Sequence, residues 1–130
     1  MNKSNTASIP SLAVLQAANK YLQRGWQVIP VPFKQKSPVI KNWQNLRLTQ
    51  EDIRRVFAKP CNLGVLLGEP SGWLVDIDLD HPLAARLAAV FLPPTGAVFG
   101  RAGKPASHWL YTCPEAKTVK WQHNGTMLLE

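Results

Sequence analysis

The sequence predicts an α+β fold in which helices pack on an antiparallel or mixed β-sheet. Three observations lead to this class: apolar residues at helical spacing near the start, several short runs rich in β-formers, and the hairpin dipeptide Asn124-Gly125 near the end. The length of 130 residues suits one domain. We expect residues 1–10 to be a loose N-terminal segment and residues 11–130 to form the domain.

The first half of the chain predicts two helices with a strand between them. Apolar residues recur at helical spacing from position 12 to position 22, and Gly25 is placed to end that helix. Residues 26–31 are rich in β-formers and predict a strand that Pro30 and Pro32 end. Thr49 is placed to cap a second helix, because Asp52 follows it at the position of a capping box.

The second half predicts a hairpin, a third helix and further strands. Residues 63–67 and 73–79 are apolar runs joined by a turn that contains proline and glycine, so they predict a hairpin. Asp80 is placed to cap a helix over residues 81–91, which two prolines then end. The remaining strand candidates are residues 98–99, 108–112, 118–121 and 126–130.

The charge balance favours a polyanionic partner. The formal net charge is +7 and the sequence pI is about 9.8. Neutralising the phosphates of a nucleic acid releases counterions, so such a protein suits nucleic-acid binding. The loop over residues 34–42 carries Lys34, Lys36 and Lys41, which we expect to contact nucleic acid. An ordinary basic surface is the alternative interpretation.

The cysteine content and the hydropathy argue against a zinc-binding, a secreted and a membrane-spanning protein. Cys61 and Cys113 lie far apart and lack the spacing of a zinc site, which is typical of reduced thiols in a cytosolic protein. No apolar run reaches the ~18 residues of a membrane span, and no charged-then-apolar leader opens the chain. We therefore expect a cytoplasmic protein with no membrane partner.

A pair of aspartates is the strongest local signal. Asp76 and Asp78 alternate with Val75, Ile77 and Leu79, so in a strand both carboxylates point to one face. Two such carboxylates can share hard divalent cations, and two cations in one site serve phosphoryl transfer. The alternative is the polar, solvent-facing side of a half-buried sheet.

A glycine-bearing basic segment over residues 99–111 is the second signal. Arg101 and Lys104 supply cations, and Ser107 and His108 open the strand that follows. Backbone N–H groups, cations and an imidazole donor suit a triphosphate. A basic loop with a surface histidine is the alternative. Glu130 is of interest because it follows a hairpin that could bring it beside the aspartates.

In their order along the chain, these residues resemble the N-terminal primase-polymerase domain of the archaeo-eukaryotic primase superfamily, found in bifunctional proteins of plasmids, phages and bacteria. The resemblance spans roughly residues 12–130. The segments that carry it are Leu22-Gln23-Arg24-Gly25-Trp26, Lys36-Ser37-Pro38, Lys41-Asn42-Trp43-Gln44, Asn62-Leu63-Gly64-Val65, Ser71-Gly72-Trp73-Leu74-Val75-Asp76-Ile77-Asp78, residues 100–111 and Leu129-Glu130.

The resemblance implies an RRM-like catalytic core and a metal-dependent DNA primase and polymerase. Asp76 and Asp78 match the family's metal-binding aspartates, His108 its nucleotide-binding histidine, and Glu130 its third acidic ligand. It also implies Mg²⁺ or Mn²⁺, a DNA template, nucleoside triphosphates and a helicase domain in the same or a neighbouring chain. Ala106 stands where the family often has serine, and glutamate stands at 130 where aspartate is commoner.

The sequence leaves two main functions open, with a metal-dependent nuclease as a more distant third. The first is nucleotidyl transfer in the replication of plasmid, phage or mobile-element DNA. The second is a non-catalytic nucleic-acid-binding module on the same scaffold. The family sequence continues past its third motif, so we expect further residues after Glu130, and the activity of the fragment alone stays open.

Overall fold

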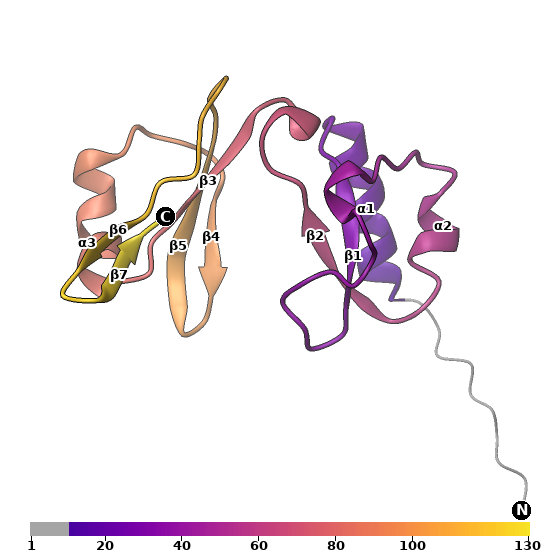
Figure 1. Ribbon diagram of the computed structural model, residues 1–130, viewed down its shortest axis with the longest axis horizontal. Coiled ribbons are helices and arrows are strands. Elements are labelled where there is room, and N and C mark those ends of the chain that lie inside the picture. Colours follow the sequence, from indigo (N-terminus) through magenta and orange to yellow (C-terminus); the bar gives the residue numbers. More distant parts are fainter. Residues whose placement is uncertain (1–10) are drawn as a thin grey trace, which may run out of the picture. The chain divides into compact units, whose positions relative to one another are not determined.

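The computed structural model describes residues 11–130, so the N-terminal segment expected over residues 1–10 lies outside the described residues. The chain forms two compact units, which divide between Leu66 and Leu67 (Figure 1). Both units combine helices with antiparallel strand pairs, which confirms the α+β class. No helix among the described residues is long and apolar enough to cross a membrane.

The first unit opens with helix α1, Leu12–Gln23. Gly25 has a φ of 82° and ends the helix as predicted. Its N–H donates to the carbonyl of Leu22, and the N–H of Trp26 donates to the carbonyl of Tyr21. This is the Schellman arrangement, and the Tyr21 and Trp26 rings complete it with centroids 5.4 Å apart.

Strand β1, Val28–Pro32, pairs antiparallel with β2, Cys61–Val65. The sequence predicted that Pro30 and Pro32 would end the first strand. Pro32 is its last residue, as predicted, but the strand runs through Pro30. Leu66 N–H donates to the carbonyl of Gln27. The backbone N–H and C=O groups of odd-numbered residues in β1 therefore point toward β2. Pro30 and Pro32 therefore face away from β2, where a missing N–H breaks no ladder bond.

The core of the first unit lies between α1, β1 and α2, Ile53–Val56. Its buried members are Ala18, Val28, Leu48, Ile53 and Phe57. A short 3₁₀ helix, η1, spans Trp43–Asn45.

The second helix begins at Ile53 and its N-cap residue is Asp52, whereas the predicted cap was Thr49. The Asp52 carboxylate accepts from the Thr49 N–H and hydroxyl, both at 2.9 Å. These bonds, with one from Arg55, lower the pKa of Asp52 to about 2. They form an ordered turn ahead of the helix, and the helix itself is a single turn.

The second unit contains a three-stranded antiparallel sheet. Its strands are β3 (Leu74–Asp78), β4 (Val98–Arg101) and β5 (Lys104–Thr112), in the order β3-β5-β4. The predicted hairpin between residues 63–67 and 73–79 does not form. The 3₁₀ turn η2, Glu69–Ser71, separates the two runs, and each pairs with another strand.

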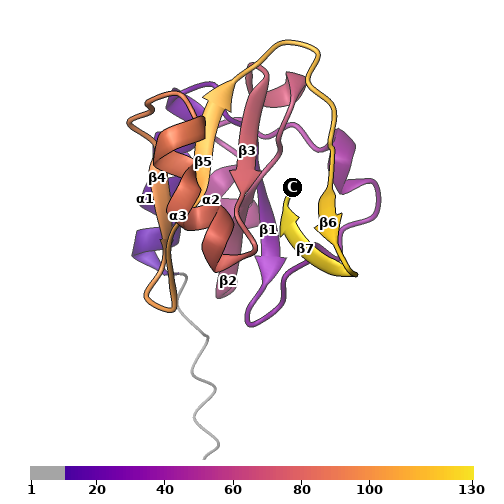
Figure 2. The same ribbon diagram turned by 90° about the vertical axis from the view of Figure 1, so that its left-hand side faces the viewer.

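Helix α3, Pro82–Phe91, covers one face of this sheet (Figure 2). The predicted cap, Asp80, was wrong: His81 caps the helix, and its ring nitrogen Nδ1 accepts from the Leu83 N–H at 3.1 Å. Pro82 holds the residue before it in an extended conformation, with a φ of −106° at His81, so the cap falls there. The helix ends before Pro93 as predicted.

A hairpin closes the described chain. Strands β6 (Trp121–His123) and β7 (Thr126–Leu129) are joined by Asn124-Gly125, as predicted. Both turn residues have positive φ, 48° and 76°, as a type I′ turn requires. Leu129 then bridges Leu79, so the end of β7 lies at the edge of β3.

Candidate active site

Four side chains form a row across one face of the second unit's sheet. Phe99 of β4 lies opposite His108 of β5, and His108 lies opposite Asp78 of β3. Asp78 and Glu130 exchange both backbone hydrogen bonds, at 2.8 and 3.0 Å. Directly paired residues of antiparallel strands share a face, so all four side chains project to one side. Asp76 projects there too, two residues before Asp78.

The histidine contacts both predicted metal-binding aspartates. His108 Nδ1 lies 2.8 Å from Asp76 Oδ2 and 3.8 Å from Asp78 Oδ1. An ionised carboxylate can only accept, so Nδ1 carries a proton and donates a hydrogen bond to the Asp76 carboxylate. Nε2 has no protein partner among the described residues. The structure thus brings together the three residues that the sequence singled out for catalysis.

Asp76 is the most enclosed acid of the group, with a side chain only 20% exposed. Burial raises its pKa above the ordinary value of 3.8, the His108 hydrogen bond and charge act against this rise, and the charge of Asp78 adds to it. Its Oδ2 accepts from His108, but its Oδ1 is buried and has no hydrogen-bond partner within residues 11–130. An orphaned carboxylate oxygen is costly unless a donor or cation meets it.

Glu130 shares this face, but its carboxylate pairs with another residue. Glu130 Oε2 lies 3.2 Å from Lys120 Nζ. Within residues 11–130 no three carboxylate, imidazole or thiol groups are close enough to enclose one metal ion. The structure therefore brings Asp76 and Asp78 together but does not gather Glu130 with them around one point. Carboxylate oxygens suit hard divalent cations, so the aspartate pair and the orphaned Oδ1 fit such an ion.

The basic glycine segment is a tight hairpin rather than an open loop. Arg101 pairs with Lys104 across a two-residue turn, and the register shifts between Phe99 and Arg101. Arg101 is exposed at the tip. Lys104 Nζ lies 3.4 Å from Asp80 Oδ1. Ser107 is only 3% exposed, so its hydroxyl is buried and does not lie on the protein surface.

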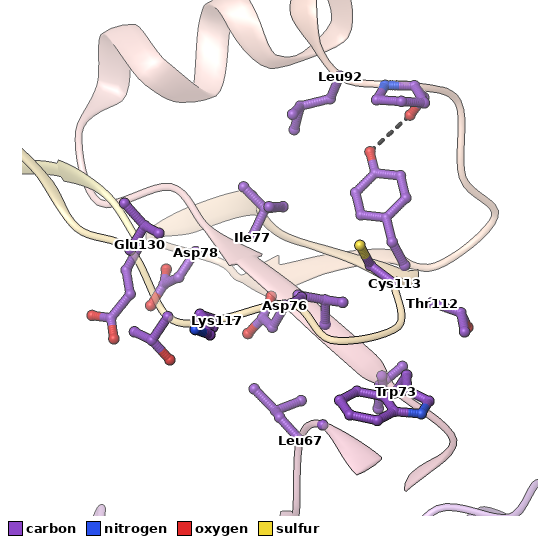
Figure 3. A pocket seen from close by; sticks show the side chains of 18 of the residues that line it. Leu67, Trp73, Asp76, Ile77, Asp78, Leu92, Thr112, Cys113, Lys117 and Glu130 are labelled. Atoms are coloured by element: carbon purple, nitrogen blue, oxygen red, sulfur yellow. Dashed lines mark hydrogen bonds between the residues drawn. The ribbon is translucent and has the colours of Figure 1, made fainter.

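A cleft of about 850 Å³ lies beside β3 (Figure 3). Asp76, Asp78 and Glu130 line it together with Trp73 and Lys117. The close-up shows the three acids on one side of β3 and Ile77 on the other.

Most residues that line this cleft were not predicted from the sequence, and Trp73 and Lys117 are among them. Trp73 could have been noticed because it follows a glycine turn and enters the aspartate strand. Lys117 stands in an irregular segment between β5 and β6 and gives no sequence signal.

The comparison with known protein families identifies the chain. The family described as "Bifunctional DNA primase/polymerase, N-terminal" (Prim-Pol) matches residues 18–127. The chain belongs to the Prim-Pol family. The match covers most of both units, and it confirms the resemblance found in the sequence. No curated protein matches the chain. At the family level, Prim-Pol membership indicates nucleotidyl transfer of the DNA primase and polymerase type, with DNA and nucleotides as substrates.

The remaining predicted contacts of this Prim-Pol chain lie in the first unit. Lys34, Lys36 and Lys41 are all exposed in the loop after β1. Lys34 has a φ of 62°, and its Nζ lies 5.6 Å from the Phe33 ring centroid. Trp43 is half-buried in η1.

Proposed function

We propose that this chain catalyses template-directed nucleotidyl transfer that depends on Mg²⁺ or Mn²⁺, in the replication of plasmid, phage or mobile-element DNA. One observation carries the proposal: His108 Nδ1 lies 2.8 Å from Asp76 and 3.8 Å from Asp78, on the face of β3 that lines a cleft. Like-charged carboxylates this close repel, and a cation offsets that repulsion.

The aspartates are the proposed metal ligands. Asp76 offers its buried Oδ1, which no other described residue contacts by a hydrogen bond, and Asp78 offers a more exposed carboxylate beside it. Divalent ions held there supply charge stabilisation for the attacking and leaving oxygens of the transfer. Glu130 would join them by leaving Lys120, an ion pair that is about half exposed and therefore contributes only about 0–1 kcal/mol.

His108 is the proposed phosphate ligand. Its Nδ1 stays on Asp76, which fixes the ring and leaves Nε2 to face the nucleotide. With Nδ1 donating to Asp76, donation from Nε2 to a phosphate oxygen uses the imidazolium form of the ring, which carries a proton on both nitrogens. Arg101 and Lys104, at the tip of the β4–β5 hairpin, are the further cations that we assign to the triphosphate.

The DNA template is the proposed polyanionic partner. The net charge of +7 favours it, and Lys34, Lys36 and Lys41 expose their side chains to phosphates. A helicase domain in the same or a neighbouring chain is the further partner that we propose, on the family resemblance alone.

Primer extension and de novo synthesis with labelled nucleotides and Mn²⁺ test the proposal. Wild type should incorporate nucleotides, and Asp76→Ala should abolish incorporation while Glu69→Gln, an exposed acid outside the site, should not. If wild type shows no synthesis, and DNA binding is equal in wild type and Asp76→Ala, the chain is a non-catalytic binding module instead.

A further inference from the structure

Phe99 is the aromatic partner of the site histidine. It lies opposite His108 across the β4–β5 pairing. The two ring centroids are 4.9 Å apart, and the ring planes differ by only 14°, so the rings are stacked. The imidazole of His108 therefore has Asp76 at one edge and a phenyl ring against one face. The edge contact limits rotation of the ring, and the face contact limits its tilt.

Core packing does not account for a phenylalanine at this position. Phe99 is 52% exposed, and all four residues of β4 are exposed. The neighbouring Val98 faces the opposite side of the sheet, because side chains alternate along a strand. The stack on His108 is thus the contact that gives the Phe99 ring a fixed place.

The backbone next to Phe99 is held closely against β5. A Cβ on Gly100 would collide with the carbonyl of Lys104 and would lie 2.9 Å from the backbone nitrogen of Ala106. Glycine allows this close approach, and the register shift that follows Phe99 begins there. The position of Phe99 relative to His108 is therefore fixed by the strand pairing and by the glycine after it.

We propose that Phe99 is a positioning residue that holds the His108 imidazole for nucleotide binding. It keeps Nδ1 on Asp76 and leaves Nε2 free for a phosphate oxygen. The inference rests on the proposed function, because it gives Phe99 a part in the same site. Stacked aromatic pairs are worth enough that losing the stack should weaken nucleotide binding by about two- to tenfold.

Two substitutions separate the aromatic face from simple bulk. Phe99→Leu keeps an apolar side chain but removes the stack, and Phe99→Tyr keeps the ring. Val98→Ala is the matched control on the same strand and the opposite face. The readouts are the NMR signals of the His108 ring protons, which a stacked phenyl shifts upfield, and the affinities for ATP and for dATP with Mg²⁺, with His108→Ala as reference.

We expect Phe99→Leu to lose the upfield shift and to bind both nucleotides about two- to tenfold more weakly. Phe99→Tyr and Val98→Ala should match wild type, and His108→Ala should bind most weakly. Unchanged His108 signals in Phe99→Leu, or changed signals with unchanged affinity, would overturn the assignment of Phe99. If His108→Ala binds as wild type does, the role of His108 in the proposed function fails, and the role of Phe99 fails with it.

Discussion

His108 donates from Nδ1 to Asp76 Oδ2 at 2.8 Å, and this bond joins β5 to β3 in the sheet of the second unit. It satisfies one oxygen of a carboxylate whose other oxygen is buried and finds no hydrogen-bond partner in the described part of the chain. The contact that positions the imidazole is therefore also the contact that makes burial of Asp76 tolerable.

Replacing His108 should destabilise the fold. In His108→Leu the Asp76 Oδ2 loses its donor, so the free energy of unfolding should fall by about 1 kcal/mol, since an acceptor left unpaired in a half-buried place is costly. His123→Leu, in the exposed β6–β7 hairpin, is the matched control and should leave stability unchanged. Urea unfolding at neutral pH measures both. Equal stability of His108→Leu and wild type would show that the bond contributes nothing.

Asp76 should give the stability a specific pH dependence. Burial raises the pKa of Asp76 in the folded chain above the ordinary value of 3.8, so the folded state holds this proton more tightly. The stability that Asp76 contributes is full below about 3.8 and is lost as the pH rises through the folded pKa.

The Asp76→Asn variant has no carboxyl group at this position, so its side chain does not titrate. Its free energy of unfolding relative to wild type should rise from about pH 3.8 upward and reach a plateau above the folded pKa. Urea unfolding over a pH series measures the difference. A difference that stays constant across the series would contradict the raised pKa.

Much of the fold could be predicted because its signals are local. Gly25 ends α1, two prolines end α3, and Asn124-Gly125 forms its hairpin, since each depends on the backbone preferences of one or two residues. Strand partners depend on contacts far apart in the sequence. The expected pairing of residues 63–67 with 73–79 was therefore wrong, although both segments are strands.

The site shows the same division. The spacing of Asp76 and Asp78 was enough to place both on one face, because side chains alternate along a strand. The pairing of β3 with β5 sets His108 opposite Asp78, and the β4–β5 hairpin with its bulge sets Phe99 opposite His108. That register could not be read from the sequence, and so Phe99 was not singled out.

Substitution by alanine should change the stability differently at the two glycines of the β4–β5 hairpin. Gly100→Ala places a Cβ against the Lys104 carbonyl, so it should cost about 1–3 kcal/mol of stability, as overpacking does. Gly103→Ala meets nothing within 4 Å and should be close to neutral. Thermal unfolding of the two variants compares them directly. Equal unfolding temperatures would show that β4 and β5 do not approach as closely as described.

The backbone of Asp76 should exchange its amide hydrogen readily. The Leu79 N–H donates to β5, so the backbone N–H and C=O groups of odd-numbered residues in β3 point toward that strand. The backbone groups of even-numbered residues point toward the cleft. Leu74 and Asp78 find partners there in Gly68 and Glu130. Asp76, between them, has no backbone partner among the described residues. Hydrogen exchange should therefore be faster at Asp76 than at Ile77, and equal protection of the two amides would mean that another segment covers the edge.

Mn²⁺ binding followed by electron paramagnetic resonance tests the central claim most directly. If Asp76 and Asp78 jointly hold divalent cations beside His108, wild type should bind Mn²⁺, and Asp76→Asn and Asp78→Asn should each lower the affinity at least about tenfold. Glu69→Gln should bind as wild type does. Unchanged Mn²⁺ affinity in both aspartate variants would contradict the claim that this face of the sheet is a metal-dependent catalytic centre.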